Sequence, residues 1–138
     1  MNAVIVSGYF NPLHKGHLEL FEKAREKGSE LWVIVNNDIQ RELKGSKMFM
    51  DENERIKIIR ALSLVDKAFI SLDKQTTQIT TLIAIHTMFG YEYSLSFANG
   101  GDQNNKSIPE SKICKELGIR LIDGLGKKIQ SSSRLLEK

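Results

Sequence analysis

Residues 3–17 read Ala-Val-Ile-Val-Ser-Gly-Tyr-Phe-Asn-Pro-Leu-His-Lys-Gly-His, and we expect them to hold a strand, a loop and the start of a helix. The apolar run at 3–6 does not alternate with polar residues, which is typical of a strand covered on both faces. Beyond it, Leu18, Phe21 and Ala24 recur at helical spacing until Gly28. A buried strand followed by such a helix predicts a parallel sheet with helices on its faces.

The rest of the chain repeats this alternation. We expect strands at residues 31–35, 68–71, 93–98 and 119–122, and helices at 75–89 and 109–117, after Asp51 and after Ser131. Residues 36–50 are predicted to form a long polar loop. The sequence therefore predicts an α/β fold with a Rossmann-like, doubly wound, five-stranded parallel sheet of order 3-2-1-4-5. In such a sheet the ligand crevice lies at the carboxyl ends of the strands beside strand one.

Length and composition indicate one ordinary domain covering residues 1–138. The chain has 138 residues, of which 41% are hydrophobic and 27% charged, and its net charge is +3. Its apolar runs are far shorter than the roughly 20 residues that span a bilayer. No basic residue precedes the first apolar run, so we expect no signal peptide, no membrane contact and a cytoplasmic location.

Two further features narrow the functional classes. Cys114 is the only cysteine, which excludes an internal disulfide and any zinc site with several thiolates. Lysine and glutamate are mixed through the helical segments, whereas a nucleic-acid-binding protein gathers its basic residues on one stripe with aromatics between them. We therefore expect no nucleic-acid partner. The mild positive charge suits a phosphorylated ligand.

His14 and His17 stand three residues apart where the loop after the first strand enters a helix. Both imidazoles can therefore face one pocket near the helix N-terminus, whose free N–H groups favour phosphate. Gly16 between them permits close approach of a phosphate to the backbone. Two alternatives are a metal site, for which no third ligand is evident nearby, and a pair of histidines that only cap the helix.

Other candidates follow later in the chain, each with a plainer alternative. Lys44 can fold from the long loop onto phosphate, or it is a solvated loop lysine. Arg55 can bind a phosphate oxygen through its two-pronged guanidinium, or it pairs with a neighbouring glutamate. The three serines at 131–133 can hold phosphates, or they cap the last helix. Asp66 is interpreted as mainly structural.

The segment Gly8-Tyr-Phe-Asn-Pro-Leu-His-Lys-Gly-His17 resembles the G-x-F-D/N-x-x-H-x-G-H signature of the cytidylyltransferase-like nucleotidyltransferases. Further segments resemble the later blocks of that family in the same order, so the resemblance covers nearly the whole chain. These segments are Asn36-Asn-Asp38, Leu43-Lys-Gly45, Glu54-Arg55, Val65-Asp66, Asn99-Gly-Gly-Asp102 and Ser131-Ser-Ser-Arg-Leu135.

The resemblance implies transfer of a nucleoside monophosphate from CTP or ATP to a small phosphorylated acceptor, with release of pyrophosphate. The acceptor would be of the glycerol phosphate or sugar 1-phosphate class, Mg²⁺ the cofactor and a homodimer the assembly. The implied catalytic residues are His14, His17, Lys44 and Arg55, with the histidines donating hydrogen bonds to the triphosphate. The implied nucleotide-binding residues are Gly8, Tyr9, Phe10, Asn11, Gly16, Gly100, Gly101, Asp102, Lys128, Ser131, Ser132 and Ser133.

The chain departs from the family pattern at several points. Asn11 stands where many members have aspartate, and residues 124–130 lack the Arg-Thr-Glu-Gly run of the glycerol-3-phosphate enzymes, so that Lys127 or Lys128 would replace its arginine. The segments at 43–45 and 99–102 resemble the heptose-1-phosphate adenylyltransferases more closely, which leaves the base, cytosine or adenine, open. Residues 75–93 are longer than in either relative and are a candidate subunit contact.

Two rival functions remain to be weighed. A phosphate-loop NTPase is disfavoured because the glycines before Lys127 do not satisfy G-x-x-x-x-G-K-S/T and lie far from the first strand. A nucleotide-binding sensor without turnover is the second alternative. The combination of His14, His17, Lys44 and Arg55 argues against it, since a silent pocket needs no donors for the transition state. Release of pyrophosphate separates the enzyme from the sensor.

Overall fold

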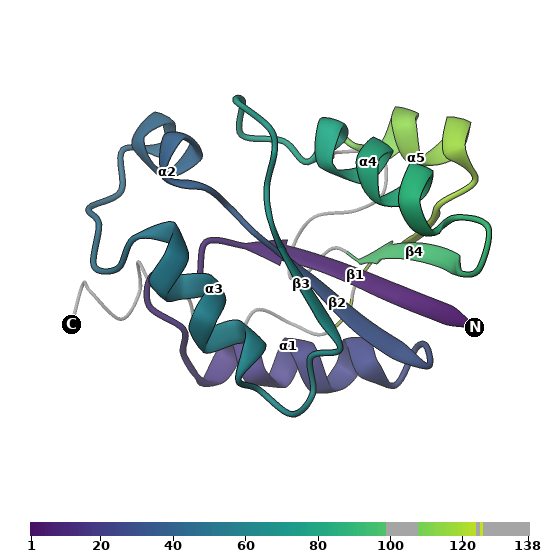
Figure 1. Ribbon diagram of the computed structural model, residues 1–138, viewed down its shortest axis with the longest axis horizontal. Coiled ribbons are helices and arrows are strands. Elements are labelled where there is room, and N and C mark those ends of the chain that lie inside the picture. Colours follow the sequence, from purple (N-terminus) through teal and green to yellow (C-terminus); the bar gives the residue numbers. More distant parts are fainter. Residues whose placement is uncertain (99–107, 124, 126–138) are drawn as a thin grey trace.

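The computed structural model describes residues 1–98, 108–123 and 125, and in this part of the chain strands and helices alternate (Figure 1). The strands are β1 Asn2–Gly8, β2 Glu30–Val35, β3 Lys67–Ile70, β4 Ser94–Ala98 and β5 Arg120–Ile122. The helices are α1 Lys15–Arg25, α2 Asp38–Lys44, α3 Glu52–Arg60, α4 Ile79–Phe89 and α5 Ser111–Leu117. Within the described ranges, no helix is long and apolar enough to cross a bilayer.

The described strands form a parallel sheet of order β3-β2-β1-β4-β5. This confirms the predicted fold class and strand order. β1 lies in the centre, where Ile5 is opposite Trp32 of β2 on one side and Phe97 of β4 on the other. The chain moves from β1 to β2 and β3, then returns to the other side of β1 for β4. The strand order thus reverses beside β1, at the place where doubly wound folds bind ligands.

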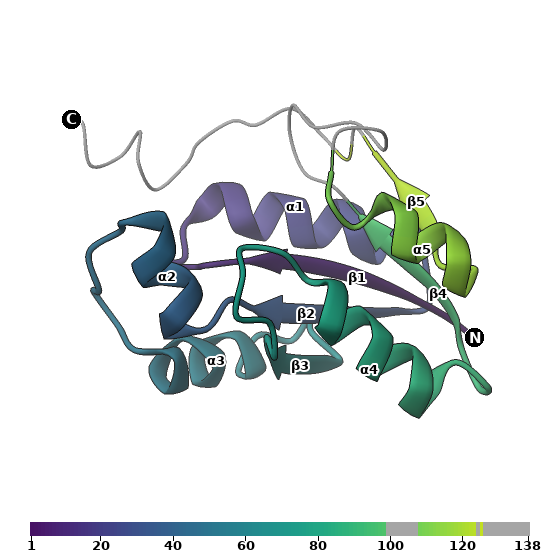
Figure 2. The same ribbon diagram turned by 90° about the horizontal axis from the view of Figure 1, so that it is seen from above.

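Two hydrophobic cores explain why the first strand is apolar throughout. Val4 and Val6 face the core beneath α1 and α3, whereas Ala3 and Ile5 face the core beneath α4 and α5. Figures 1 and 2 show these two pairs of helices on opposite faces of the sheet. Because side chains alternate along a strand, a strand with a core on each face needs apolar residues at every position.

Residues 36–50 are not the uninterrupted loop that we expected, because α2 occupies 38–44. Asn37 begins this helix: its side-chain oxygen accepts from the Gln40 N–H, and the Gln40 side chain accepts from the Asn37 N–H. Gly45 ends it with φ of 82°, in the left-handed region. Figure 2 shows α2 at the end of the sheet where β1 and β2 finish.

Some predicted boundaries also move. The helix expected from residue 75 begins at Ile79, because the buried Asp73 carboxylate accepts the N–H groups of Thr80 and Thr81 and so caps α4 from outside the helix. The helix expected from residue 109 begins at Ser111. The helix expected after Ser131 lies outside the described residues.

Candidate active site

The structure brings His14 and His17 together at the start of α1. Their rings are stacked, with centroids 3.8 Å apart and planes 25° from parallel. The Gly16 N–H donates to His14 Nδ1 at 3.1 Å, and the His14 N–H donates to His17 Nδ1 at 3.1 Å. The two imidazoles therefore form a reciprocal capping box, which satisfies backbone donors that a helix start leaves without partners.

These contacts determine how the rings carry their protons. A nitrogen that accepts a backbone N–H bond cannot itself be protonated, so each neutral ring has its hydrogen on Nε2. Burial lowers the pKa of His14. Burial, and then the charge that His14 would carry, lowers the pKa of His17 to about 4. At neutral pH the pair consists of two uncharged rings, each with an Nε2–H donor on the side away from the helix backbone.

The arrangement suits an anion that approaches the first turn of α1. His14 Nε2 is shielded from solvent and has no hydrogen-bond partner, which is costly for a polar atom unless a ligand supplies one. The histidines do cap the helix, and this is compatible with phosphate binding because capping uses Nδ1 and leaves Nε2. Phosphate binding by the pair stays a prediction. The described residues contain no group of three or more His, Cys, Asp or Glu that could hold a metal.

The lowered pKa of His17 gives a prediction about pH. Between pH about 4 and about 6.5 the unfolded chain binds a proton at His17 and the folded chain does not. Stability from this group is therefore fully present above pH about 6.5 and falls as the pH decreases through that window. An NMR titration should show His17 still neutral at pH about 5.5, with the urea-unfolded chain as the reference. A midpoint near 6.5 in the folded protein would contradict the structure.

Asn11 holds the segment between α2 and α3 against the histidine loop. Its side-chain nitrogen donates to the Lys47 carbonyl at 2.6 Å, and its side-chain oxygen accepts from the N–H groups of Phe49 and Met50 at 3.0 and 3.2 Å. Only an amide offers both a donor and an acceptor here, because an ionised aspartate has no hydrogen to donate. The departure from the family pattern at this position thus has a structural reason. Direct contact of Asn11 with nucleotide stays a prediction.

Asn11→Asp should destabilise the protein. The variant places a carboxylate against the Lys47 carbonyl and removes one hydrogen bond in a buried position, so the expected loss is about 1–3 kcal/mol. Urea unfolding would measure it. Asn2→Asp is the matched control, because Asn2 is exposed and the substitution introduces the same negative charge. Equal stability of the two variants would mean that the Asn11 amide contributes nothing.

Arg55 lies inside the protein at the junction of four segments. Nε donates to the Met50 carbonyl at 3.1 Å, and Nη1 donates to the carbonyls of Tyr9 and Asn36 at 2.8 and 2.6 Å. Nη2 donates to Asp38 Oδ1 at 2.7 Å. The ion pair therefore forms with Asp38 rather than with a neighbouring glutamate, and the side chain is fully buried. These contacts make Arg55 a group that positions the site, and direct contact with substrate stays a prediction.

Lys44 is the last residue of α2 and not part of a loop as expected. Its Nζ lies 4.4 Å from the centre of the Tyr9 ring, close enough for a cation–π contact. The Tyr9 hydroxyl donates to the Gln40 carbonyl at 3.4 Å, and burial raises the pKa of Tyr9. The structure thus places Lys44 against the residue that precedes Phe10 in the histidine loop. Its contact with phosphate stays a prediction.

Gly8 and Phe10 were predicted to bind nucleotide; the structure shows that both take part in packing, and their contact with nucleotide stays a prediction. Phe10 is 2% exposed and packs edge-on with His17 and Phe21, at ring distances of 4.9 and 5.5 Å. A Cβ at Gly8 would lie 2.8 Å from the Phe10 ring, so the ring occupies the space that glycine leaves. The Phe10 side chain is therefore part of the core beneath the histidines and offers no exposed face for a base.

Several predicted residues lie outside the described part of the chain. They are Gly100, Gly101, Asp102, Lys127, Lys128, Ser131, Ser132 and Ser133. Asp66, by contrast, is described and has the structural role expected of it. Its Oδ2 accepts the Leu31 N–H at 2.8 Å and lies 3.6 Å from Arg25 Nε.

Sequence reasoning did not find a cluster of buried polar residues at the end of β2. Gln78 donates from its backbone N–H to Glu110 at 2.7 Å and from its side chain to Asn36 at 3.1 Å, and all three residues are buried. They connect the end of β2 to the starts of α4 and α5. Glutamine and glutamate at these positions carry no distinctive spacing, so nothing in the sequence indicated the contact.

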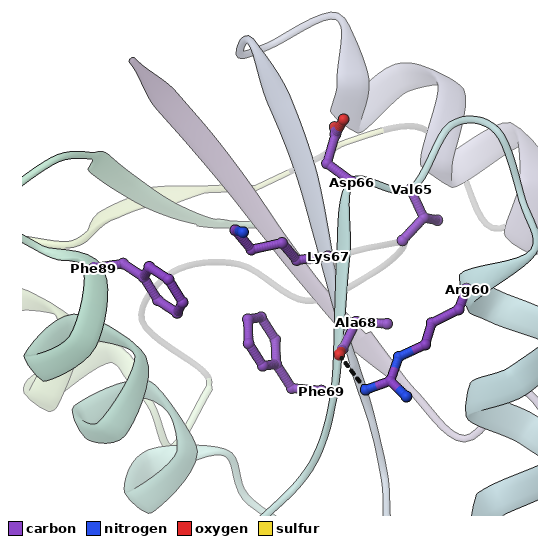
Figure 3. A pocket seen from close by; sticks show the side chains of 7 residues that line it. All are labelled: Arg60, Val65, Asp66, Lys67, Ala68, Phe69 and Phe89. Atoms are coloured by element: carbon purple, nitrogen blue, oxygen red, sulfur yellow. Dashed lines mark hydrogen bonds between the residues drawn. The ribbon is translucent and has the colours of Figure 1, made fainter.

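A groove of about 330 Å³ lies elsewhere, along the start of β3. Figure 3 shows Lys67, Phe69 and Phe89 directed towards it, with Arg60 donating to the Ala68 carbonyl beside it. None of the predicted site residues lines this groove. It lies at the amino end of β3, whereas the histidine pair follows the carboxyl end of β1.

The model of the family described as cytidylyltransferase-like matches residues 5–120, which include both histidines, α2, Arg55 and the whole of β2, β3 and β4. The chain belongs to this family. The resemblance to this family inferred from the sequence is therefore confirmed.

Its curated relatives include proteins named FAD synthase and HldE. An FAD synthase from Methanosarcina barkeri is 36% identical over 123 residues, which cover 83% of this chain and 88% of the relative. The bifunctional protein HldE from Koribacter versatilis is 41% identical over 138 residues, covering 98% of this chain and 26% of HldE. An FAD synthase from Methanohalophilus mahii is 36% identical over 74 residues. This cytidylyltransferase-like chain spans about half the length of that synthase (51%) and about a quarter of HldE.

Solved structures agree on the fold. The lipopolysaccharide core biosynthesis protein from Thermoplasma volcanium matches with a TM-score of 0.71, and the match covers 89% of the cytidylyltransferase-like chain and 95% of the other. The sequence identity of 23% makes this a likeness of fold alone.

Proposed function

We propose that the chain is an adenylyltransferase, which transfers the adenylyl group of ATP to the phosphate of a small acceptor and releases pyrophosphate. The choice of ATP over CTP is supported by the relatives named FAD synthase and HldE, since FAD contains an adenylyl group joined to a flavin phosphate. The acceptor is a phosphate monoester, of the flavin phosphate or sugar 1-phosphate class.

One observation carries the proposal: two neutral imidazoles, stacked at 3.8 Å, present Nε2–H donors at the positive end of α1. Both substrates of this reaction carry several negative charges. The site therefore has to offer hydrogen-bond donors to the phosphate oxygens, and not groups that take up a proton. Neutral N–H donors bind phosphate oxygens, and their hydrogen bonds strengthen as charge develops in the transition state.

The reaction needs no covalent intermediate. An oxygen of the acceptor phosphate attacks the α-phosphorus of ATP and forms the new P–O bond. The bond from the α-phosphorus to the oxygen bridging to the β-phosphorus breaks, and pyrophosphate leaves with that electron pair. His14 and His17 would donate to oxygens of the triphosphate throughout, and neither accepts a proton because each Nδ1 already accepts a backbone N–H.

Magnesium remains a prediction. The donor set of the described site consists mainly of N–H groups, and the nearby Asp38 carboxylate already pairs with Arg55 and accepts the Glu52 N–H. The described residues therefore do not fit a protein-held cation at this place, and the steps above use none. Magnesium carried by the phosphates of the nucleotide would enter with the substrate.

Pyrophosphate release tests the proposal. The protein is incubated with magnesium and each of ATP, CTP, GTP and UTP, paired with flavin mononucleotide, a sugar 1-phosphate or glycerol 3-phosphate. We expect pyrophosphate with ATP and one acceptor, and an adenylylated product by mass spectrometry. Turnover with CTP in preference to ATP would refute the assignment of the base. Binding of nucleotides without turnover on any acceptor would favour the sensor.

A further inference from the structure

Phe10 has a backbone conformation that calls for an explanation. Its φ is 52°, and it is the one non-glycine residue in the described ranges with positive φ. An aromatic L-residue pays a steric penalty there and keeps such a conformation only when its surroundings fix it. Local strain of this kind gathers at functional sites.

The conformation places the Phe10 ring beneath the histidine pair. The ring lies 4.9 Å from the His17 ring at 80°, an edge-to-face arrangement, and 5.5 Å from Phe21 at 68°. Gly8 makes the place available, because a Cβ there would meet the Phe10 ring at 2.8 Å. Phe10 thus packs on one side against the core residue Phe21 and on the other against His17.

His17 is consequently held by three contacts. Its Nδ1 accepts the His14 N–H, its face stacks on His14, and Phe10 packs against it edge to face. The hydrogen bond alone holds Nδ1 but does not fix the plane of the ring, which lies half-buried in the first turn of the helix. Packing against a buried ring removes that freedom and keeps Nδ1 directed at the backbone.

We propose that Phe10 is a positioning residue, which holds His17 in the orientation and tautomer that present Nε2–H to the nucleotide phosphates. The inference rests on the proposed function for its substrate, but the state of the His17 ring is measurable without turnover. The lowered pKa of His17 supports it, because the Phe10 ring contributes to the burial that keeps His17 uncharged.

Phe10→Leu and Phe21→Leu form a matched pair of variants. Both residues are buried in one cluster, and they pack on each other, but Phe10 contacts the His17 ring. Both variants should lower the melting temperature. Phe10→Leu should also lower kcat about tenfold or more, with KM for ATP within about threefold, because a misplaced donor costs transition-state binding. Phe21→Leu should keep kcat near that of the wild type.

Nitrogen-15 NMR of the imidazoles provides the second readout. In the wild type His17 should show a bare Nδ1 and a protonated Nε2, and Phe10→Leu should add a population with the hydrogen on Nδ1. Gly8→Ala, which forces the ring away while keeping Phe10, should give the same change if Phe10→Leu does not fold. Equal kcat and equal spectra for Phe10→Leu and Phe21→Leu would overturn the proposal. If the wild type shows no turnover but Phe10→Leu still changes the His17 spectrum in this way, only the proposed function is refuted.

Discussion

Removing either imidazole from the start of α1 should lower turnover by a factor on the order of 10² to 10³. His14→Ala and His17→Ala each delete one Nε2–H donor that would bind the triphosphate where charge develops. The loss should fall on kcat as much as on kcat/KM, because these donors act mainly in the transition state. Pyrophosphate release at saturating ATP measures it.

The same variants remove caps of the helix, so stability must be measured beside activity. Loss of a capping side chain costs about 1 kcal/mol, too little to unfold a domain of ordinary stability. His86→Ala removes the third histidine of the chain, which lies on α4, and should leave turnover unchanged. Wild-type rates in both His14→Ala and His17→Ala would refute the assignment of the site.

Replacing Arg55 with methionine should give the largest loss of stability, about 3–5 kcal/mol. The change leaves the Asp38 carboxylate without its closest partner, and it removes the donors for the carbonyls of Met50, Tyr9 and Asn36. Buried acceptors without donors are costly, and a half-buried carboxylate without its cation adds to that cost. Urea unfolding measures the difference.

Lys57→Met is the control for this variant. Lys57 lies on the same helix and is exposed, and its substitution by methionine removes the same positive charge. It should change stability by less than about 0.5 kcal/mol. If Arg55→Met instead keeps the stability of the wild type and loses only turnover, Arg55 acts on the substrate and the positioning role is wrong.

The architecture could be predicted because its signals are local and apolar. The run at 3–6 and the segment at 31–35 are continuous apolar stretches, and the structure buries them on both faces of the sheet. The right-handed crossovers that parallel strands require limit the possible arrangements, and the doubly wound pattern supplies the expected strand order. The start of α1 was also readable, since His14 and His17 lie three residues apart and thus share one face.

The elements that sequence reasoning missed depend on polar contacts between distant residues. α2 has Gln40 at its centre, and this amide is buried because it donates to the carbonyls of Gln75 and Thr77, some 35 residues away. Such a helix has no apolar periodicity from which it could be predicted. Its one local signal was Asn37 followed three residues later by Gln40, which is the pattern of a capping box.

The roles of individual site residues were harder to predict than their presence. The buried side chain of Arg55 has hydrogen-bond partners between 5 and 46 residues away in the chain. A contact with a residue as distant as Tyr9 leaves no spacing pattern in the sequence. Phe10 belongs to the same motif as the histidines, yet its ring turns inward. Only the left-handed backbone at Phe10 and the free space at Gly8 explain that direction.

In each ring of the histidine pair, Nδ1 caps α1 and Nε2–H is a hydrogen-bond donor, and this double role limits which substitutions the protein can accept during evolution. Aspartate at position 14 would begin α1 as well as histidine does, so selection for a stable fold alone would accept it. An ionised aspartate, however, only accepts hydrogen bonds, and bound phosphates would need a donor at this place. A descendant with such a substitution would keep the fold and lose turnover. It would be recognisable by an intact start of α1 that lacks the donor at position 14.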